Sequence, residues 1–136
     1  MKRVLFVLLL LAAAAFMTAC GGEEAAESEP FAITVSGDDA FVYDPGTITV
    51  AAGTEVNLTF KNIGALDHNW ILVTEDTDPL TVTDASAFAG INVGLIPGNS
   101  EKTYTFTAPA AGTYKYVCTV AGHAAGGMVG TLTVTE

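Results

Sequence analysis

The chain has 136 residues, half of them hydrophobic, with 5 basic against 15 acidic side chains and a formal net charge of −10. So acidic a surface excludes nucleic acid and anionic lipid head groups as charge-matched partners. The length and the apolar content fit one domain with one core, and the sequence has no internal repeat.

The first 19 residues have the pattern of an export signal. Lys2 and Arg3 precede an apolar run over residues 4–16, which is too short to span a bilayer, and small residues follow it. We therefore expect residues 1–19 to be a signal peptide, and the protein to act at the periplasmic or extracellular face of the cytoplasmic membrane. Removing the signal leaves 3 basic against 15 acidic residues, a formal net charge of −12.

Cys20 stands where the export signal ends. Residues 17–21, Met-Thr-Ala-Cys-Gly, resemble a bacterial lipobox, in which Cys20 would be diacylated and become the first mature residue. A plain secretory signal and a disulfide between Cys20 and Cys118 are the alternatives, since the chain has two cysteines. We expect lipidation at Cys20 and a disordered tether over residues 20–30, because Gly, Glu, Ala and Ser show no apolar period there.

From residue 31 onward, apolar and polar residues alternate with a period of two, which predicts half-buried antiparallel strands. The expected inward-facing rows are Ile33 and Val35; Ile48 and Val50; Val56, Leu58 and Phe60; Tyr104 and Phe106; Tyr114 and Tyr116; Leu132 and Val134. Turn signals at residues 44–46, 52–53, 97–99 and 112 separate them. Short strands at this spacing predict an all-β, Greek-key β-sandwich over residues 31–136.

Residues 75–94 interrupt this alternation. Within them, residues 83–88 (Thr-Asp-Ala-Ser-Ala-Phe) favour a helical turn, with Thr83 or Asp84 as its N-cap. We expect one short helical flap here.

Three candidate metal donors follow one another at five-residue intervals near the C-terminus. They are Cys118, His123 and Met128. The chain's second histidine, His68, begins the apolar run at 68–73, which we expect to form a strand. One thiolate, two imidazoles and a weak axial thioether are the donor set of a blue-copper electron-transfer site. Each residue alone could be an ordinary core side chain, but the combination favours the metal site. A dinuclear or all-imidazole copper centre would need more donors, and methionine is a poor ligand for structural zinc.

These residues resemble the pattern of the cupredoxins, the small blue copper proteins, and within them the auracyanin and azurin branch. The resemblance rests on His-Asn-Trp at 68–70 and on the Cys-x4-His-x4-Met spacing that ends at Met128, and it extends over residues 31–136. It implies a plastocyanin-like domain that binds one type 1 copper ion through His68, Cys118, His123 and Met128.

The resemblance also implies roles around the metal. Asn69 would hydrogen-bond toward Thr119; the alternative is an ordinary residue at a strand end. Asp67 stands where azurins have a glycine whose carbonyl approaches copper, so that contact is not implied here. Trp70 is expected to fill the core. The edge of His123 would be the electron port, in an apolar patch formed by Leu66, Ala124 and Ala125.

The expected function is that of a monomeric, membrane-tethered one-electron carrier. Its copper would cycle between Cu(II) and Cu(I) in brief encounters with a donor and an acceptor of a photosynthetic or respiratory chain. A copper storage or delivery protein and a metal-free, adhesion-type sandwich are the alternatives. An enzyme is not expected, because four donors leave no position open for substrate and the chain has no further histidine.

Overall fold

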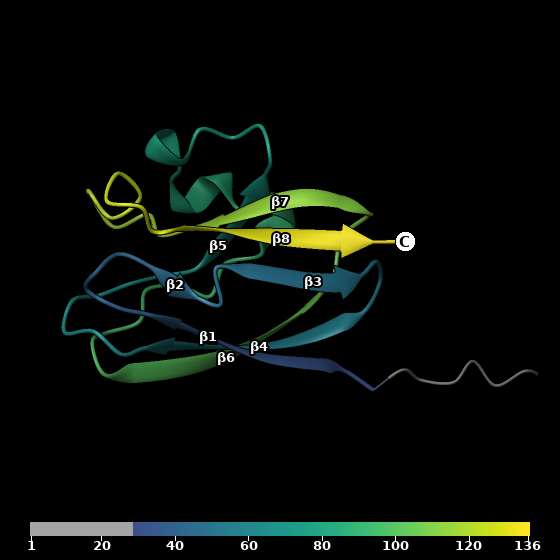
Figure 1. The fold of residues 1–136 in the computed structure, drawn as a ribbon, viewed down its shortest axis with the longest axis horizontal. Helices are drawn as coiled ribbons and strands as arrows, with labels where there is room; N and C mark the ends of the chain where they lie inside the picture. Colours follow the sequence, from purple (N-terminus) through teal and green to yellow (C-terminus); the bar gives the residue numbers. More distant parts are fainter. Residues whose placement is uncertain (1–28) are drawn as a thin grey trace, which may run out of the picture.

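A computed structural model describes residues 29–136 as two four-stranded sheets, in the orders β2-β1-β4-β6 and β3-β8-β7-β5, stacked face to face (Figure 1). The predicted all-β sandwich is thus confirmed. The predicted signal peptide, Cys20 and most of the predicted tether at residues 20–30 lie outside the described residues. The strands are β1 (Phe31–Gly37), β2 (Tyr43–Asp44), β3 (Thr47–Ala51), β4 (Glu55–Asn62), β5 (Ile71–Thr74), β6 (Ser100–Thr107), β7 (Gly112–Val117) and β8 (Val129–Thr135).

The predicted inward rows face the space between the sheets. In β4, Val56, Leu58 and Phe60 are buried, whereas the residues between them are partly exposed. Not every strand pair is antiparallel as predicted, because β1 pairs with β4, and β3 with β8, in parallel register. From β2 to β7 the chain passes from one sheet to the other at each step. Strands that are neighbours in a sheet are therefore seldom consecutive in the chain. The alternation of apolar and polar residues indicates which side chains are buried, but it does not indicate whether two neighbouring strands run parallel or antiparallel.

β5 is buried on both of its faces. Leu72 packs in the main core, whereas Ile71 and Val73 pack beneath Val82 and Ala87 of the segment that follows β5. In Figure 1 this segment lies on the face of the β3-β8-β7-β5 sheet that points away from the other sheet. Its cover over β5 explains why the run at 71–73 is continuously apolar.

The covering segment forms three single turns in place of the one helical turn predicted. They are the 3-10 turns η1 (Pro79–Thr81), η2 (Asp84–Ser86) and η3 (Phe88–Gly90), and Thr83 is the N-cap of η2 as expected. The segment returns to β5 directly after η3, where the Leu72 N–H donates to the Ile91 carbonyl at 3.1 Å. Within residues 29–136, no helix has the length and apolar character needed to cross a membrane.

An aromatic group occupies the centre of the core. Trp70 is fully buried, as predicted, and stacks on Tyr116 with ring centroids 5.2 Å apart. The hydroxyl of Tyr116 donates to the Pro45 carbonyl at 2.7 Å. The Tyr116 ring is therefore held on one face by Trp70 and at its hydroxyl by Pro45.

Gly130 leaves the space that this tyrosine fills. It lies opposite Tyr116 in the β7–β8 pair, and a Cβ on Gly130 would overlap the Tyr116 ring. We expect Gly130→Ala to lower the free energy of unfolding by about 1–3 kcal/mol, because a fixed ring cannot move aside. Gly46→Ala is the matched control, since the nearest atom to its added Cβ lies at 3.5 Å. Urea unfolding of the copper-free protein measures both variants, and an equal change in the two would show that the overlap costs nothing.

Candidate metal centre

The two histidines and Cys118 come together in the folded chain. The loop between β7 and β8, which carries Cys118 and His123, lies at the end of the sandwich opposite the C-terminus in Figure 1. Nδ1 of His68 lies 3.0 Å from Nδ1 of His123, and Sγ of Cys118 lies 3.5 Å from the same His123 nitrogen. One donor atom from each residue lies within 4.8 Å of the other two, and all three residues are buried. The fold thus brings His68 to the two donors of the C-terminal loop.

The connection between β7 and β8 carries three of the four expected donors. Cys118 follows directly after β7, and its N–H donates to the Met128 carbonyl at 3.2 Å, which joins the two ends of the loop. The N–H of Met128 donates in turn to the His123 carbonyl at 3.0 Å. Gly122 and Gly127 have φ values of 86° and 111°, which favour glycine, so the small residues of this loop permit its tight turns.

Met128 is fully buried in the same core cluster as Cys118. Its terminal methyl group lies against β1, where a Cβ on Gly37 would be only 2.7 Å from Met128 Cε. A larger residue at position 37 would therefore displace the thioether. His68, Cys118, His123 and Met128 together form a cluster typical of a type 1 copper site.

His68 lies outside the strands, which corrects the prediction that it begins one. β5 starts only at Ile71. His68 instead forms an isolated bridge with Ile96: its N–H donates to the Ile96 carbonyl at 3.1 Å, and the Ile96 N–H returns a bond at 2.8 Å. The apolar run at 68–73 gave no sign of this break, because residues 68–70 are buried like those of the strand.

The side chain of Asn69 joins the His68 segment to the residue after Cys118. Its Nδ2 donates to Thr119 Oγ1 at 2.7 Å, and its Oδ1 accepts from the Thr119 N–H at 2.8 Å. The Asn69 backbone is held as well, because the hydroxyl of Tyr43 donates to its carbonyl at 2.5 Å. The segments that carry His68 and Cys118 are therefore connected by two hydrogen bonds, and a third bond joins the His68 segment to β2.

Burial shifts the pKa values of two donors in the metal-free chain. It raises the pKa of the Cys118 thiol, an effect that hydrogen bonds from the backbone of Asn69 and Val120 partly offset. Burial lowers the pKa of His123, and the neighbouring His68 lowers it further. At neutral pH the thiol therefore retains its proton while His123 is neutral, so binding of a metal to the thiolate must release the Cys118 proton.

Phe41 covers the His123 ring, a position that no sequence pattern indicated. The two rings stack with centroids 4.4 Å apart and planes inclined by 30°, and His123 is only 6% exposed. Of the residues expected around this imidazole, Leu66 and Ala125 are exposed and Ala124 is half-buried. Phe41 is a single aromatic residue in a loop, so no periodic pattern could have assigned it to this position.

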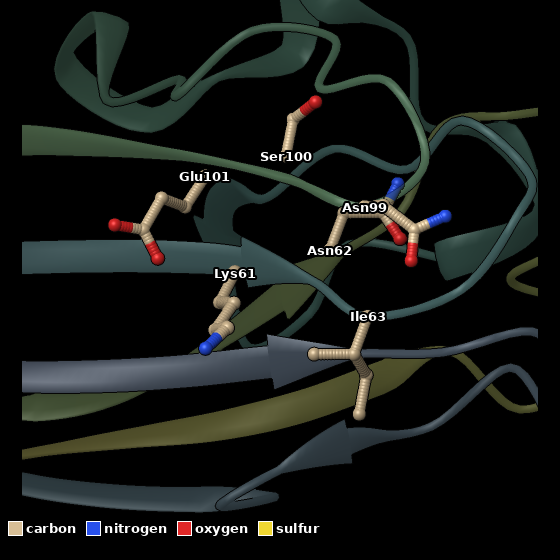
Figure 2. Close-up of a pocket in the computed structure, with 6 residues that line it drawn as sticks. All are labelled: Lys61, Asn62, Ile63, Asn99, Ser100 and Glu101. Atoms are coloured by element: carbon tan, nitrogen blue, oxygen red, sulfur yellow. The ribbon is translucent and has the colours of Figure 1, made fainter.

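One hollow of the described chain is separate from these donors. It has a volume of about 270 Å³ and lies where β4 ends and β6 begins, as Figure 2 shows. None of the four donors lines it, and its Asn62 is already engaged with the carbonyls of Leu66 and Ile96 at 2.7 and 2.9 Å. Its lining residues are Lys61, Asn62, Ile63, Asn99, Ser100 and Glu101.

The chemistry of the donor set fits one copper ion. Bonds from a divalent metal to an imidazole nitrogen are about 2.0–2.1 Å long, so two Nδ1 atoms 3.0 Å apart can contact a single ion. Two imidazoles and a thiolate with a weak thioether suit copper, whereas methionine offers little to zinc. His68, Cys118 and His123 would hold the ion, and Met128 would offer a weak fourth donor, its thioether.

Comparisons with known proteins agree with this geometry. The family model described as copper binding proteins, plastocyanin/azurin family, matches residues 31–135. Auracyanin-A of Chloroflexus aurantiacus is 34% identical over 146 residues, covering 89% of this chain and 90% of that protein. Plastocyanin of Rumex obtusifolius is 40% identical over 103 residues, covering 75% of this chain and 97% of that protein. The crystal structure of dithionite-reduced auracyanin from the photosynthetic bacterium Roseiflexus castenholzii matches with a TM-score of 0.65 at 30% identity, over 77% of this chain and 97% of that chain.

Proposed function

Because this chain belongs to the plastocyanin/azurin family of copper-binding proteins, we propose that it is a blue copper protein that carries single electrons between two redox partners. Proteins of this family are electron carriers and not enzymes. The proposal rests on the convergence of three buried donors from two segments that are distant in the sequence, with Nδ1 of His68 and Nδ1 of His123 3.0 Å apart.

The chain's contribution is to hold these donors still. Bound copper supplies a one-electron Cu(II)/Cu(I) couple. Electron transfer is fast when the surroundings change little between the two states, and sites built on rigid elements keep their geometry best. Cys118 is fixed by the end of β7, His68 by its bridge to Ile96, and the two segments by Asn69.

Electrons would enter and leave through His123 and the Phe41 ring that covers it. The loops beside these two rings expose large apolar side chains, which suit brief encounters with a partner better than a permanent complex. With Ala124 and Ala125, they would form the docking patch around the port. The exposed large apolar residues of these loops are Val42, Ile63, Leu66 and Leu95.

The setting of this carrier is the finer part of the proposal. A diacylated Cys20 would anchor the protein to the outer face of the cytoplasmic membrane, and residues 20–30 would let the domain reach its donor and acceptor as a monomer. Two acyl chains give stable membrane attachment, unlike a single chain. The auracyanin structure from a photosynthetic bacterium supports partners in a photosynthetic or respiratory chain.

A charge introduced beside the port tests the carrier function. We expect fast electron self-exchange in the wild type and slower exchange in Ala125→Asp, because the introduced aspartates of two protein molecules then repel each other at the contact surface. The blue absorption band of the Cu(II) protein should remain intact in the variant. Ala52→Asp is the matched control, since Ala52 is exposed in the turn that pairs with Thr135 at the other end of the sandwich. Line broadening in mixtures of reduced and oxidised protein measures the rate. Slow exchange in the wild type contradicts the carrier function, whereas equal slowing in the two variants contradicts the port.

A further inference from the structure

The carboxylate of Asp39 lies against the outer edge of the His68 ring. Asp39 belongs to the turn that follows β1, and its Oδ1 is 3.3 Å from Nε2 of His68. The same carboxylate accepts two backbone hydrogen bonds, from the Ala65 N–H at 2.8 Å and from the Leu66 N–H at 3.1 Å. Three groups from the segment that precedes β5 therefore converge on one side chain.

The residues around this carboxylate hold it in one position. Gly64 is required there, because a Cβ at that position would overlap Oδ1 of Asp39. The Gly64 N–H is itself held by Oδ1 of the buried Asn62, at 3.0 Å. These contacts fix the segment whose N–H groups bond to the carboxylate. Asp39 is therefore held in place although its side chain is 40% exposed.

The turn that carries Asp39 is also anchored at its other end. Its N–H groups bond within the turn, from Ala40 to Oδ1 of Asp38 at 3.0 Å and from Phe41 to the Asp38 carbonyl at 3.0 Å. Phe41 adopts φ = 61°, a conformation that costs a non-glycine residue free energy, while its ring stacks on His123. One turn thus contacts both histidines of the metal centre.

The contact with Asp39 selects the tautomer of His68 that the site requires. A carboxylate accepts hydrogen bonds and cannot donate them, so Nε2 must carry the proton. In the neutral ring the lone pair then lies on Nδ1, the nitrogen that faces His123 and Cys118. A carboxylate on the far nitrogen of a metal-binding histidine fixes the ring and makes it a stronger ligand.

We propose that Asp39 is a positioning residue of the copper site, whose carboxylate orients His68 through Nε2 and whose negative charge favours the oxidised metal. The proposal rests on the copper function proposed above, and deepens it by assigning part of the control of reduction potential to a turn that contributes no ligand. Cu(II) carries one more positive charge than Cu(I), so a nearby carboxylate lowers the reduction potential.

Asp39→Asn tests the charge, and Asp38→Asn is its matched control. The asparagine retains one oxygen, which at the Oδ1 position can accept from Leu66 and His68, but it has no second acceptor for the Ala65 N–H that bonds to Oδ2. Asp38→Asn removes the same charge one residue away, from a carboxylate that accepts from the Ala40 N–H. We expect voltammetry to show a higher reduction potential for Asp39→Asn and a clearly smaller rise for Asp38→Asn. We also expect Asp39→Ala to lose about 10- to 100-fold in Cu(II) affinity.

Proton exchange at Nε2 of His68 gives a second readout. Long-range ¹H–¹⁵N NMR of the wild-type protein in its diamagnetic Cu(I) form should show a proton on Nε2 of His68 that exchanges slowly with water, and Asp39→Ala should make that exchange faster. Equal potentials in Asp39→Asn and Asp38→Asn, or a His68 Nε2 proton indifferent to Asp39→Ala, would overturn the proposal. Either result would leave the copper function intact, because that function requires only that the wild type bind copper and cycle.

Discussion

Cys118→Ser is expected to remove the intense blue absorption of the Cu(II) protein completely, because that band arises from the bond between copper and a thiolate. A serine hydroxyl is harder and remains protonated at neutral pH, so the affinity for copper should fall as well. The other three donors are unaffected by the exchange, and Ser is close in size to the fully buried Cys118.

The control for this variant is a substitution in the same loop that leaves Cys118 in place. Ala121→Ser places the same hydroxyl on an exposed residue between Cys118 and His123, where no donor is lost. It should keep the full band. Titration with Cu(II), followed by visible absorption, compares the two variants, and a blue Cys118→Ser protein would disprove the assignment of the thiolate.

Asn69→Ala should have the largest effect on stability among the residues that support the donors. It removes both bonds to Thr119 and leaves the Thr119 N–H without its partner, which should cost about 2–4 kcal/mol of the free energy of unfolding. Asn69 is 2% exposed, so water cannot readily replace the lost bonds.

Asn57→Ala provides the matched control for this loss. Asn57 lies in β4 and accepts one bond, from the Thr105 hydroxyl at 2.7 Å, at an exposed position. Its replacement should change the free energy of unfolding by about 0.5 kcal/mol or less. Both variants are best unfolded in urea without copper, because metal that binds only the folded state would mask the difference. A similar, small change in both would show that Asn69 does not hold the two segments together.

The four metal donors could be predicted from the sequence, because the spacing of three of them and the total number of histidines can be read directly from it. Cys118, His123 and Met128 lie in one short loop, and with only two histidines in the chain His68 had to complete the set. The inward rows of the strands were also predictable, because alternation directly reflects burial on one face of a sheet.

The parts that could not be predicted depend on contacts between distant loops. Asp39 and Phe41 lie in a short polar turn without any period, and only the folded chain brings them to His68 and His123. The start of β5 was misplaced for a related reason. Residues 68–70 are buried against the segment around Ile96 and not within a sheet, and burial alone looks the same in both settings.

An electron carrier must retain its one copper ion while it passes single electrons. To test this retention, the wild-type protein is loaded with one equivalent of Cu(II), then reduced and reoxidised repeatedly in the presence of a moderate Cu(I) chelator. We predict that the blue band disappears and returns in full at every cycle, and that the copper content stays at one ion per chain. Copper that passes to the chelator within a few cycles would instead indicate a storage or delivery protein, and a wild type that never turns blue would contradict the copper site itself.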